Sequence, residues 1–121
     1  MMVSNQNISD EMAYSLSLIR NRFIDGLEVR IEHLDTLMIK VELRHDTDNA
    51  LVEAEQEMHR ITGVAGTLGF RALGDLACAA EASLRSAISN KQNKGLLEHA
   101  IAAVDEAADV MSQIMSHNDP D

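Results

Sequence analysis

Residues 58–70 have the sequence Met-His-Arg-Ile-Thr-Gly-Val-Ala-Gly-Thr-Leu-Gly-Phe. Apolar side chains recur here at intervals of three and four residues, which is the period of one face of an α-helix. This face consists of Met58, Ile61, Ala65 and Leu68. Gly69 suits the position just after the helix, because glycine adopts the left-handed conformation that closes many helices. The segment therefore predicts a helix that ends near Gly69.

The same period continues on both sides of this segment. Upstream it passes through Leu51 and Ala54 to a helix cap at Asp46 or Thr47. It also predicts three more helices, at about residues 10–43, 71–87 and 96–116. The apolar face of the first of these consists of Leu16, Ile19, Phe23, Leu27, Ile31, Leu34, Met38 and Val41. Gly26 interrupts it and indicates a bend or a break into two helices.

The composition also favours helices. Aromatic residues make up 2% of the chain and apolar residues 45%, so aliphatic side chains and seven methionines must form the core. A sandwich or barrel would normally contain more aromatic and β-branched residues. The sequence predicts an all-α fold, an antiparallel four-helix bundle with an additional N-terminal helical segment. We expect one domain over residues 1–121, with residues 1–8 and 117–121 as frayed tails.

The chain is strongly acidic, with a formal net charge of −10. Because such a protein repels phosphates, we expect no nucleic-acid partner and no binding to anionic membranes. No apolar run approaches the roughly 20 residues that a membrane helix needs, and the N-terminus lacks the features of a signal peptide. The single Cys78 has no partner for an internal disulfide, and we expect its thiol to be buried in an apolar run. These features indicate a cytoplasmic protein.

His59 is rotated by about 100° from Met58 and so lies outside the predicted apolar face. The residues on its side of the helix are Glu55, Thr62, Gly63 and Gly66. A glycine within a helix costs about 1 kcal/mol relative to alanine, so two of them call for a compensating role. Their missing side chains would leave a bare patch beside His59, where another molecule could approach the imidazole. An exposed imidazole is a good nucleophile and can carry a covalent phosphoryl group.

This segment resembles the histidine phosphotransfer (Hpt) domain family. After its histidine, the family pattern has lysine at the third position, glycine at the fourth, and further leucine, glycine and glutamate residues downstream. The matching residues are His59, Gly63, Leu68, Gly69, Leu73 and Glu81, with Ala80 just before the last. Thr62 departs from the pattern, because it stands where the family usually has lysine. A threonine hydroxyl often bonds back to its own helix, so a positive charge would have to come from Arg60 or Arg71.

The resemblance implies a role in a two-component phosphorelay. A receiver domain of a hybrid or sensor histidine kinase would phosphorylate His59, and a response regulator's aspartate would then remove the group, with Mg²⁺ held by the receiver. It implies a phosphocarrier that is not itself an enzyme and has no cofactor of its own. The partner would dock over His59 and exposed parts of the first long helix. The residues expected to face it are Gln56, Arg60, Thr62, Gly63, Gly66 and Thr67.

Other interpretations of the same residues are open at this point. His59 could be an ordinary surface histidine, and Gly63 and Gly66 could permit close packing between helices. The bundle could also be an adaptor that binds a receiver or kinase domain without carrying phosphate, which Thr62 favours. A metal site is disfavoured, since Glu55 and His59 form only one suggestive pair. An oligomerising bundle would need a second apolar stripe, and because the sequence shows none, we expect a monomer.

Overall fold

Five helices make up the part of the chain that the structure describes, residues 2–117. This computed structural model describes side chains for residues 9–117. The helices are α1 (Met2–Asp25), α2 (Leu27–Glu42), α3 (Thr47–Ala65), α4 (Arg71–Ser89) and α5 (Lys94–His117). The described residues include no strand, which confirms the all-α class. None of these five helices combines enough length with enough apolar character to cross a membrane.

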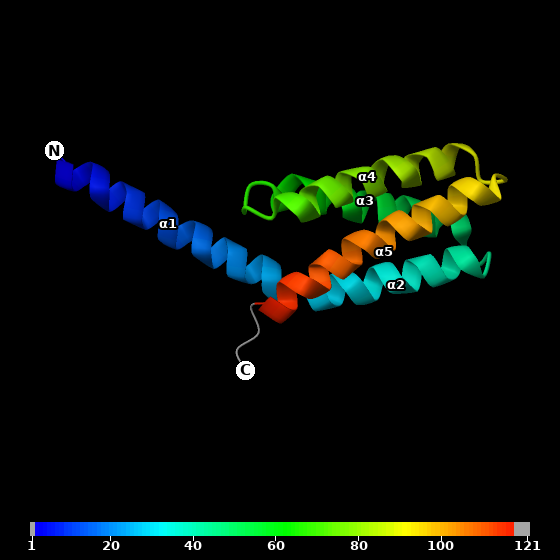
Figure 1. The fold of residues 1–121 in the computed structure, drawn as a ribbon, viewed down its shortest axis with the longest axis horizontal. Coiled ribbons are helices and arrows are strands. Elements are labelled where there is room, and N and C mark those ends of the chain that lie inside the picture. The colour runs from blue at the N-terminus through cyan, green and yellow to red at the C-terminus, as the bar shows by residue number, and fades with distance from the viewer. Residues whose placement is uncertain (1, 118–121) are drawn as a thin grey trace.

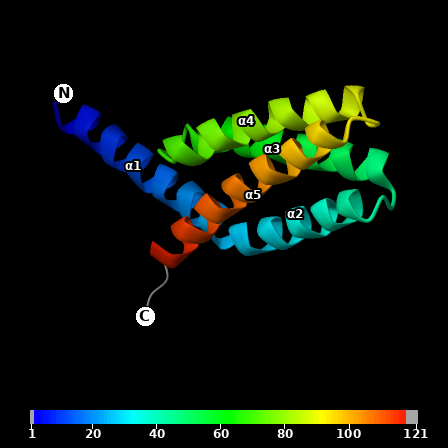
Figure 2. The same ribbon diagram turned by 45° about the vertical axis from the view of Figure 1, so that its right-hand side comes forward.

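Helices α2 to α5 form an antiparallel four-helix bundle (Figure 1). Each of them packs against two neighbours, in the cyclic order α2, α3, α4, α5. Short turns at residues 43–46, 66–70 and 90–93 reverse the direction of the chain. The turned view in Figure 2 shows α3 and α4 side by side along most of their length. The predicted bundle with an additional N-terminal helical segment is therefore confirmed.

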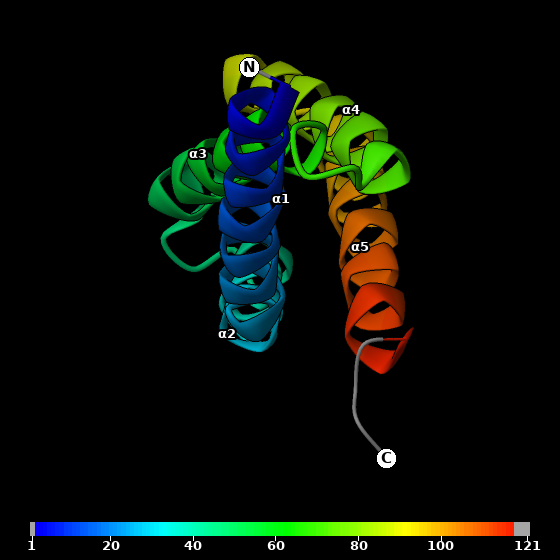
Figure 3. The ribbon, with the colours of Figure 1, turned by 90° about the vertical axis from the view of Figure 1, so that its left-hand side faces the viewer.

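The additional helix, α1, leaves the bundle and projects beyond its end (Figures 1 and 3). This splits the apolar face that was predicted over residues 10–43. The part from Leu27 to Val41 faces the core, whereas Leu16 and Ile19 are 46% and 49% exposed. The expectation that Leu16 and Ile19 belong to the core was wrong. The break lies at Gly26, whose ψ of −7° departs from helical geometry and turns the helix axis.

The ends of the chain also differ from the sequence expectation. Helix α1 already begins at Met2, so residues 2–8 are helical and do not form the expected frayed tail. No glycine or proline precedes Gly26, and nothing in this segment therefore stops a helix. At the other end, His117 is the last residue of α5. The rest of the expected C-terminal tail, residues 118–121, lies outside the described residues.

The core of the bundle is aliphatic, as the composition predicted. Its largest fully buried side chains are Leu27, Leu34, Leu37, Val41, Leu51, Met58, Ile61, Leu73, Leu84, Val104 and Met111. Near α1, the rings of Phe23 and Phe70 stack with their centroids 5.6 Å apart. The guanidinium of Arg20 lies 4.6 Å from the centre of the Phe70 ring, a cation–π contact. These contacts attach the C-terminal end of α1 to the turn between α3 and α4.

The turn after α3 closes at Gly69, as the sequence predicted. Gly69 has a φ of +88°, the left-handed conformation that a side chain disfavours. The backbone N–H of Phe70 donates to the carbonyl of Ala65 at 2.8 Å, and that of Gly69 donates to the carbonyl of Gly66 at 3.2 Å. These two bonds form a Schellman motif. At the other end of the helix, Asp46 is the cap residue, one of the two predicted.

Cys78 lies on the exposed face of α4, and the expectation of a buried thiol was wrong. Its neighbours Ala77 and Ala80 are fully buried. One step along a helix rotates a side chain by about 100°, which carries Cys78 out of the core. The apolar residues around Cys78 in the sequence therefore do not share one face of the helix.

Candidate functional site

His59 lies on the outer face of α3, and its side chain is 74% exposed. The neighbouring core residues Met58 and Ile61 are completely buried. This agrees with the helical period, which placed His59 outside the apolar face. The imidazole is therefore accessible to a molecule in solution.

One ring nitrogen of His59 is held by a carboxylate from the neighbouring helix. The Nδ1 atom lies 2.6 Å from Oε2 of Glu81 on α4. The Glu81 side chain is only 10% exposed, so the core fixes the position of its carboxylate. Because a carboxylate can only accept, Nδ1 carries the proton and donates it to Glu81. In the neutral ring, Nε2 then keeps a free lone pair.

A guanidinium shares the same carboxylate oxygen. Nη2 of Arg85 lies 2.8 Å from Oε2 of Glu81 and 3.0 Å from Oε1 of Glu55 on α3. The hydrogen bond to Glu55 and the negative charges of Glu81 and Glu55 raise the pKa of Arg85 above its already high usual value. Arg85 is thus a permanent cation, and the carboxylate of Glu81 connects it to His59 by hydrogen bonds.

The charge of Arg60 is balanced by a buried glutamate. Nη1 of Arg60 lies 2.8 Å from Oε2 of Glu57, whose other oxygen lies 2.6 Å from Nη1 of Arg30 on α2. Glu57 is only 10% exposed on its side chain, and two cations compensate its charge. Together these contacts tie the start of α2 to the middle of α3. Arg71, the other cation considered from the sequence, makes no ion pair within residues 9–117.

The patch beside His59 is bare. A Cβ atom added at Gly63 or Gly66 would meet no atom within 4 Å beyond its chain neighbours and the adjacent backbone of its own helix, and both glycines are exposed. The alternative that these two glycines permit close helix packing is therefore not supported. At Gly74 on α4, an added Cβ would lie 3.5 Å from the backbone nitrogen of Gly66, an ordinary contact distance, so α4 packs on α3 at this point. The α4 helix thus approaches the back of α3 while the front stays open.

Thr62 does not offer its hydroxyl to the patch. Its Oγ1 donates to the carbonyl of Met58 at 2.8 Å, the bond back to its own helix that the sequence suggested. The positive charge that a lysine would bring to this position is absent. The hollow around the imidazole is instead lined by Glu55, Gln56, His59, Arg60 and Arg85.

Comparison with protein families matches residues 19–115 to the Hpt domain. This match spans most of the chain, including nearly all of the four-helix bundle. The chain belongs to the Hpt domain family. Hpt domains have a histidine phosphotransfer role in two-component signalling. No curated protein and no solved structure matches the chain.

This Hpt domain gathers most of its expected partner-facing residues on one side of α3. Gln56, Arg60, Gly63, Gly66 and Thr67 are all exposed, as a docking surface requires. Thr62 is half-buried. Thr67 stands apart from His59, because it lies in the turn that follows α3. It lies instead in a groove between the α3–α4 turn and α1.

Sequence reasoning missed Arg85 in this Hpt domain, and it found Glu81 only through the family pattern. Both residues come from α4, more than 20 residues after His59. The available signal was local: Arg85 follows Glu81 by four residues, so both lie on one face of a helix. That spacing does not reveal that the face is turned toward His59.

The Hpt domain holds no candidate metal cluster within its described residues. Glu55, the residue that made a suggestive pair with His59, is engaged by Arg85 at 3.0 Å. The carboxylate of Glu55 therefore binds the guanidinium of Arg85.

Proposed function

We propose that this Hpt domain is a phosphocarrier of a phosphorelay and that His59 carries the phosphoryl group between receiver-domain aspartates. The observation that carries the proposal is the pairing of an exposed imidazole with a buried carboxylate beside a patch that lacks side chains. The hydrogen bond from Nδ1 to Glu81 at 2.6 Å leaves Nε2 as the reacting atom. The bare surface at Gly63 and Gly66 leaves room for a protein partner.

In the transfer step, the lone pair of Nε2 attacks the phosphorus atom of an aspartyl phosphate on the receiver domain. The N–P bond forms as the P–O bond to the aspartate breaks, and the aspartate carboxylate leaves with the electron pair. Nδ1 keeps its proton, so the ring becomes positively charged. The charge of Glu81 stabilises this cation. The reverse reaction hands the group to the next aspartate, and the receiver domain would supply Mg²⁺ for both.

Arg85 and Arg60 would take the place of the lysine that Thr62 replaces. Both guanidinium groups line the hollow that contains His59. Each is already paired with a carboxylate, so each is held in position before a phosphoryl group arrives. A pre-positioned cation stabilises the negative oxygens of the transferring group without the cost of rearrangement. Arg85 is the stronger candidate, because it contacts the same oxygen of Glu81 as His59.

The experiment that tests the proposal is transfer from a phosphorylated receiver domain, followed by phosphate-affinity gel electrophoresis and a test of acid lability. We expect acid-labile label on the wild type and none on His59→Gln. His99→Gln is the matched control, because His99 is also exposed but lies on α5. Equal label on His59→Gln would refute His59 as the acceptor.

A second candidate function is an adaptor that binds a receiver or kinase domain without carrying phosphate. Thr62 favours it, because its hydroxyl bonds to Met58 and brings no positive charge to the patch. An adaptor should take no label from any receiver and should bind a receiver equally well as wild type and as His59→Gln. A carrier should take the label and lose it on substitution, so the same set of proteins separates the two.

A further inference from the structure

Helix α1 carries an apolar stripe that the protein itself leaves uncovered. Met12, Leu16 and Ile19 are 60%, 46% and 49% exposed. They continue, at alternating intervals of four and three residues, to Phe23, which is buried against Phe70. This spacing is that of a coiled-coil seam. The end-on view in Figure 3 shows α1 standing in front of the bundle.

A helix in this position needs a partner. Most helical stability in proteins comes from packing of an apolar face against other elements. Among residues 9–25 of α1, for which side chains are described, only Phe23 and Ile24 at its C-terminal end pack against the core. We expected a monomer because the sequence shows no second apolar stripe. In the structure, Met12, Leu16 and Ile19 form such a stripe, because the bundle does not cover them. The stripe also lies largely outside the family match, which begins at Ile19.

The charges beside the stripe are arranged in a self-complementary way. Glu11 and Arg22 are eleven residues apart, which is about three turns, so they lie on the same flank of the stripe. Both are exposed, and neither makes an ion pair with residues 9–117. They are equally far from a point between Leu16 and Ser17. Two such helices that cross antiparallel at this point would bring each Glu11 opposite the Arg22 of the other copy.

We propose that the stripe formed by Met12, Leu16 and Ile19 binds the same stripe of a second copy of this chain, with the two α1 helices antiparallel. Each dimer would contain two Glu11–Arg22 pairs between copies. In a parallel arrangement this flank of one helix would face the opposite flank of the other, so Glu11 and Arg22 would not meet, and these pairs form only in the antiparallel arrangement. The interface is then isologous, as a two-fold symmetric dimer requires.

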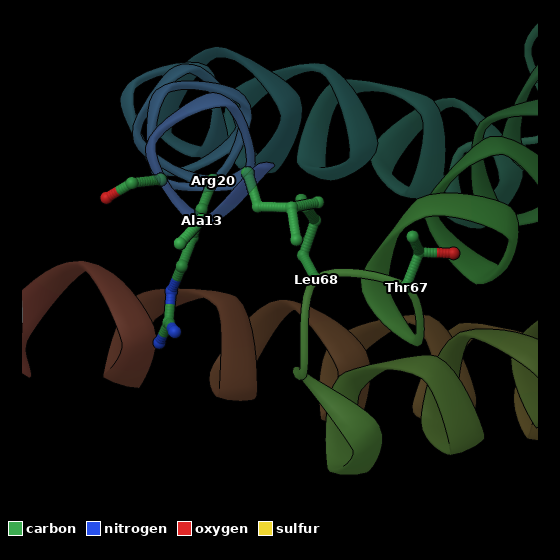
Figure 4. A pocket seen from close by; sticks show the side chains of 6 residues that line it. Ala13, Arg20, Thr67 and Leu68 are labelled. Atoms are coloured by element: carbon green, nitrogen blue, oxygen red, sulfur yellow. The ribbon is translucent and has the colours of Figure 1, made fainter. Parts of the chain in front are cut away.

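The other possible occupant of this surface is a receiver domain. A groove lined by Ala13, Leu16, Ser17, Arg20, Thr67 and Leu68 connects α1 to the α3–α4 turn. Figure 4 shows Ala13 and Arg20 on one side of it and Thr67 and Leu68 on the other. The self-complementary charge pattern favours a second copy, because two copies of α1 supply both members of each charge pair. Binding of a receiver here is a separate outcome of the experiment below.

The experiment is sedimentation equilibrium of the full chain over a range of concentrations. We expect a monomer–dimer equilibrium for the wild type and a dissociation constant at least about tenfold weaker for Leu16→Asp. Ile39→Asp is the matched control, because Ile39 is 53% exposed but lies on α2, and it should dimerise normally. Circular dichroism should show that both variants keep the bundle.

Charge exchange tests the antiparallel arrangement. Glu11→Arg and Arg22→Glu should each weaken self-association by about tenfold, since each replaces two attractive pairs with two repulsive ones. An equimolar mixture of the two variants should form a heterodimer, in which both pairs are attractive again. Failure of the mixture to associate would refute this arrangement.

A wild type that stays monomeric at all concentrations would overturn the proposal. If Leu16→Asp then lost phosphoryl transfer as well, the stripe would belong to a receiver-docking surface. The proposal does not depend on the phosphocarrier role, because His59→Gln should dimerise like the wild type. A failure of one proposal is therefore distinguishable from a failure of the other.

Discussion

A single carboxylate oxygen of Glu81 accepts two hydrogen bonds, from Nδ1 of His59 at 2.6 Å and from Nη2 of Arg85 at 2.8 Å. The carboxylate is nearly buried, while both of its partners are exposed. Hydrogen bonds to a charged group are worth more than neutral ones, roughly 1.5–3 against 0.5–1.5 kcal/mol. At the scale of residues, the orientation and electronic character of His59 therefore depend on a side chain from another helix.

Replacing Glu81 by glutamine should slow phosphoryl transfer by about tenfold. The amide oxygen of Glu81→Gln can still accept from Nδ1, so the reactive nitrogen stays the same, but the charge that stabilises the cationic ring is lost. The middles of the ranges for charged and neutral bonds differ by about 1.3 kcal/mol, which corresponds to about this factor. Single-turnover transfer from a phosphorylated receiver measures it. An unchanged rate would mean that Glu81 has only a structural role.

Replacing Arg85 by glutamine should also slow transfer by at least about tenfold, because the hollow loses a cation that is held in place. Arg85→Lys should recover part of the rate, since it restores the charge without the planar guanidinium. Arg71→Gln is the control, because Arg71 is exposed and makes no ion pair within residues 9–117. If Arg71→Gln slowed transfer as much as Arg85→Gln, the role of Arg85 would be a general charge effect.

At the scale of elements, α3 has two different sides. One side packs on α4, where Gly74 lies near the backbone of Gly66, and the other side is open at Gly63 and Gly66. The open glycines weaken the helix itself, because glycine loses more conformational freedom than other residues on folding. The Schellman motif at Gly69 and the packing on α4 offset that cost. The helix can therefore present a surface without side chains and remain folded.

Two substitutions of Gly63 test the stability of α3 and partner docking separately. Gly63→Ala should raise the free energy of unfolding by about 0.5–1 kcal/mol, because the added methyl group meets no other atom. Gly63→Arg should block transfer while the helical circular dichroism signal is unchanged, because the long side chain fills the patch. Denaturant unfolding and single-turnover transfer measure the two effects. Ala102→Arg, at an exposed position of α5, is the control and should transfer normally. Normal transfer by Gly63→Arg would rule out docking over this patch.

At the scale of the molecule, the net charge of −10 is not spread evenly. Near His59 the arginines are paired with glutamates, while acidic groups of α2 and α5 face one another. Burial raises the pKa of Asp105 on α5, and the nearby charges of Asp35, Asp109 and Glu42 raise it further. A carboxyl with a raised pKa in the folded state destabilises that state once it is ionised.

Stability should therefore fall as the pH rises from 3.8, the usual value for this carboxyl, through the raised pKa of Asp105. Asp105→Asn removes the charge and should raise the midpoint of thermal unfolding at pH 7. The higher unfolding midpoint of Asp105→Asn should vanish below pH 3.8, where the wild-type carboxyl is protonated in both the folded and the unfolded state. Glu106→Gln, an exposed position on α5, is the control. An advantage of the same size at pH 3 and pH 7 would contradict this account.

Much of the fold followed from local patterns. The apolar period predicted the helices at Leu51 to Leu68, at residues 71–87 and at residues 96–116 to within a few residues of those observed. Glycines marked the breaks at Gly26 and Gly69, because their backbones tolerate conformations that interrupt a helix. The path of α1 could not be predicted, since its apolar face resembles one that enters a core.

The sequence by itself determined that His59 lies on an outer helical face beside Gly63 and Gly66. That result depends only on rotation along one helix, which neighbouring residues fix. Only the tertiary structure decided that Glu81 and Arg85 meet His59, that Cys78 is exposed and that Leu16 is uncovered. Each of these depends on which helix packs opposite and at what angle. Packing between distant segments sets both, and no local period in the chain encodes them.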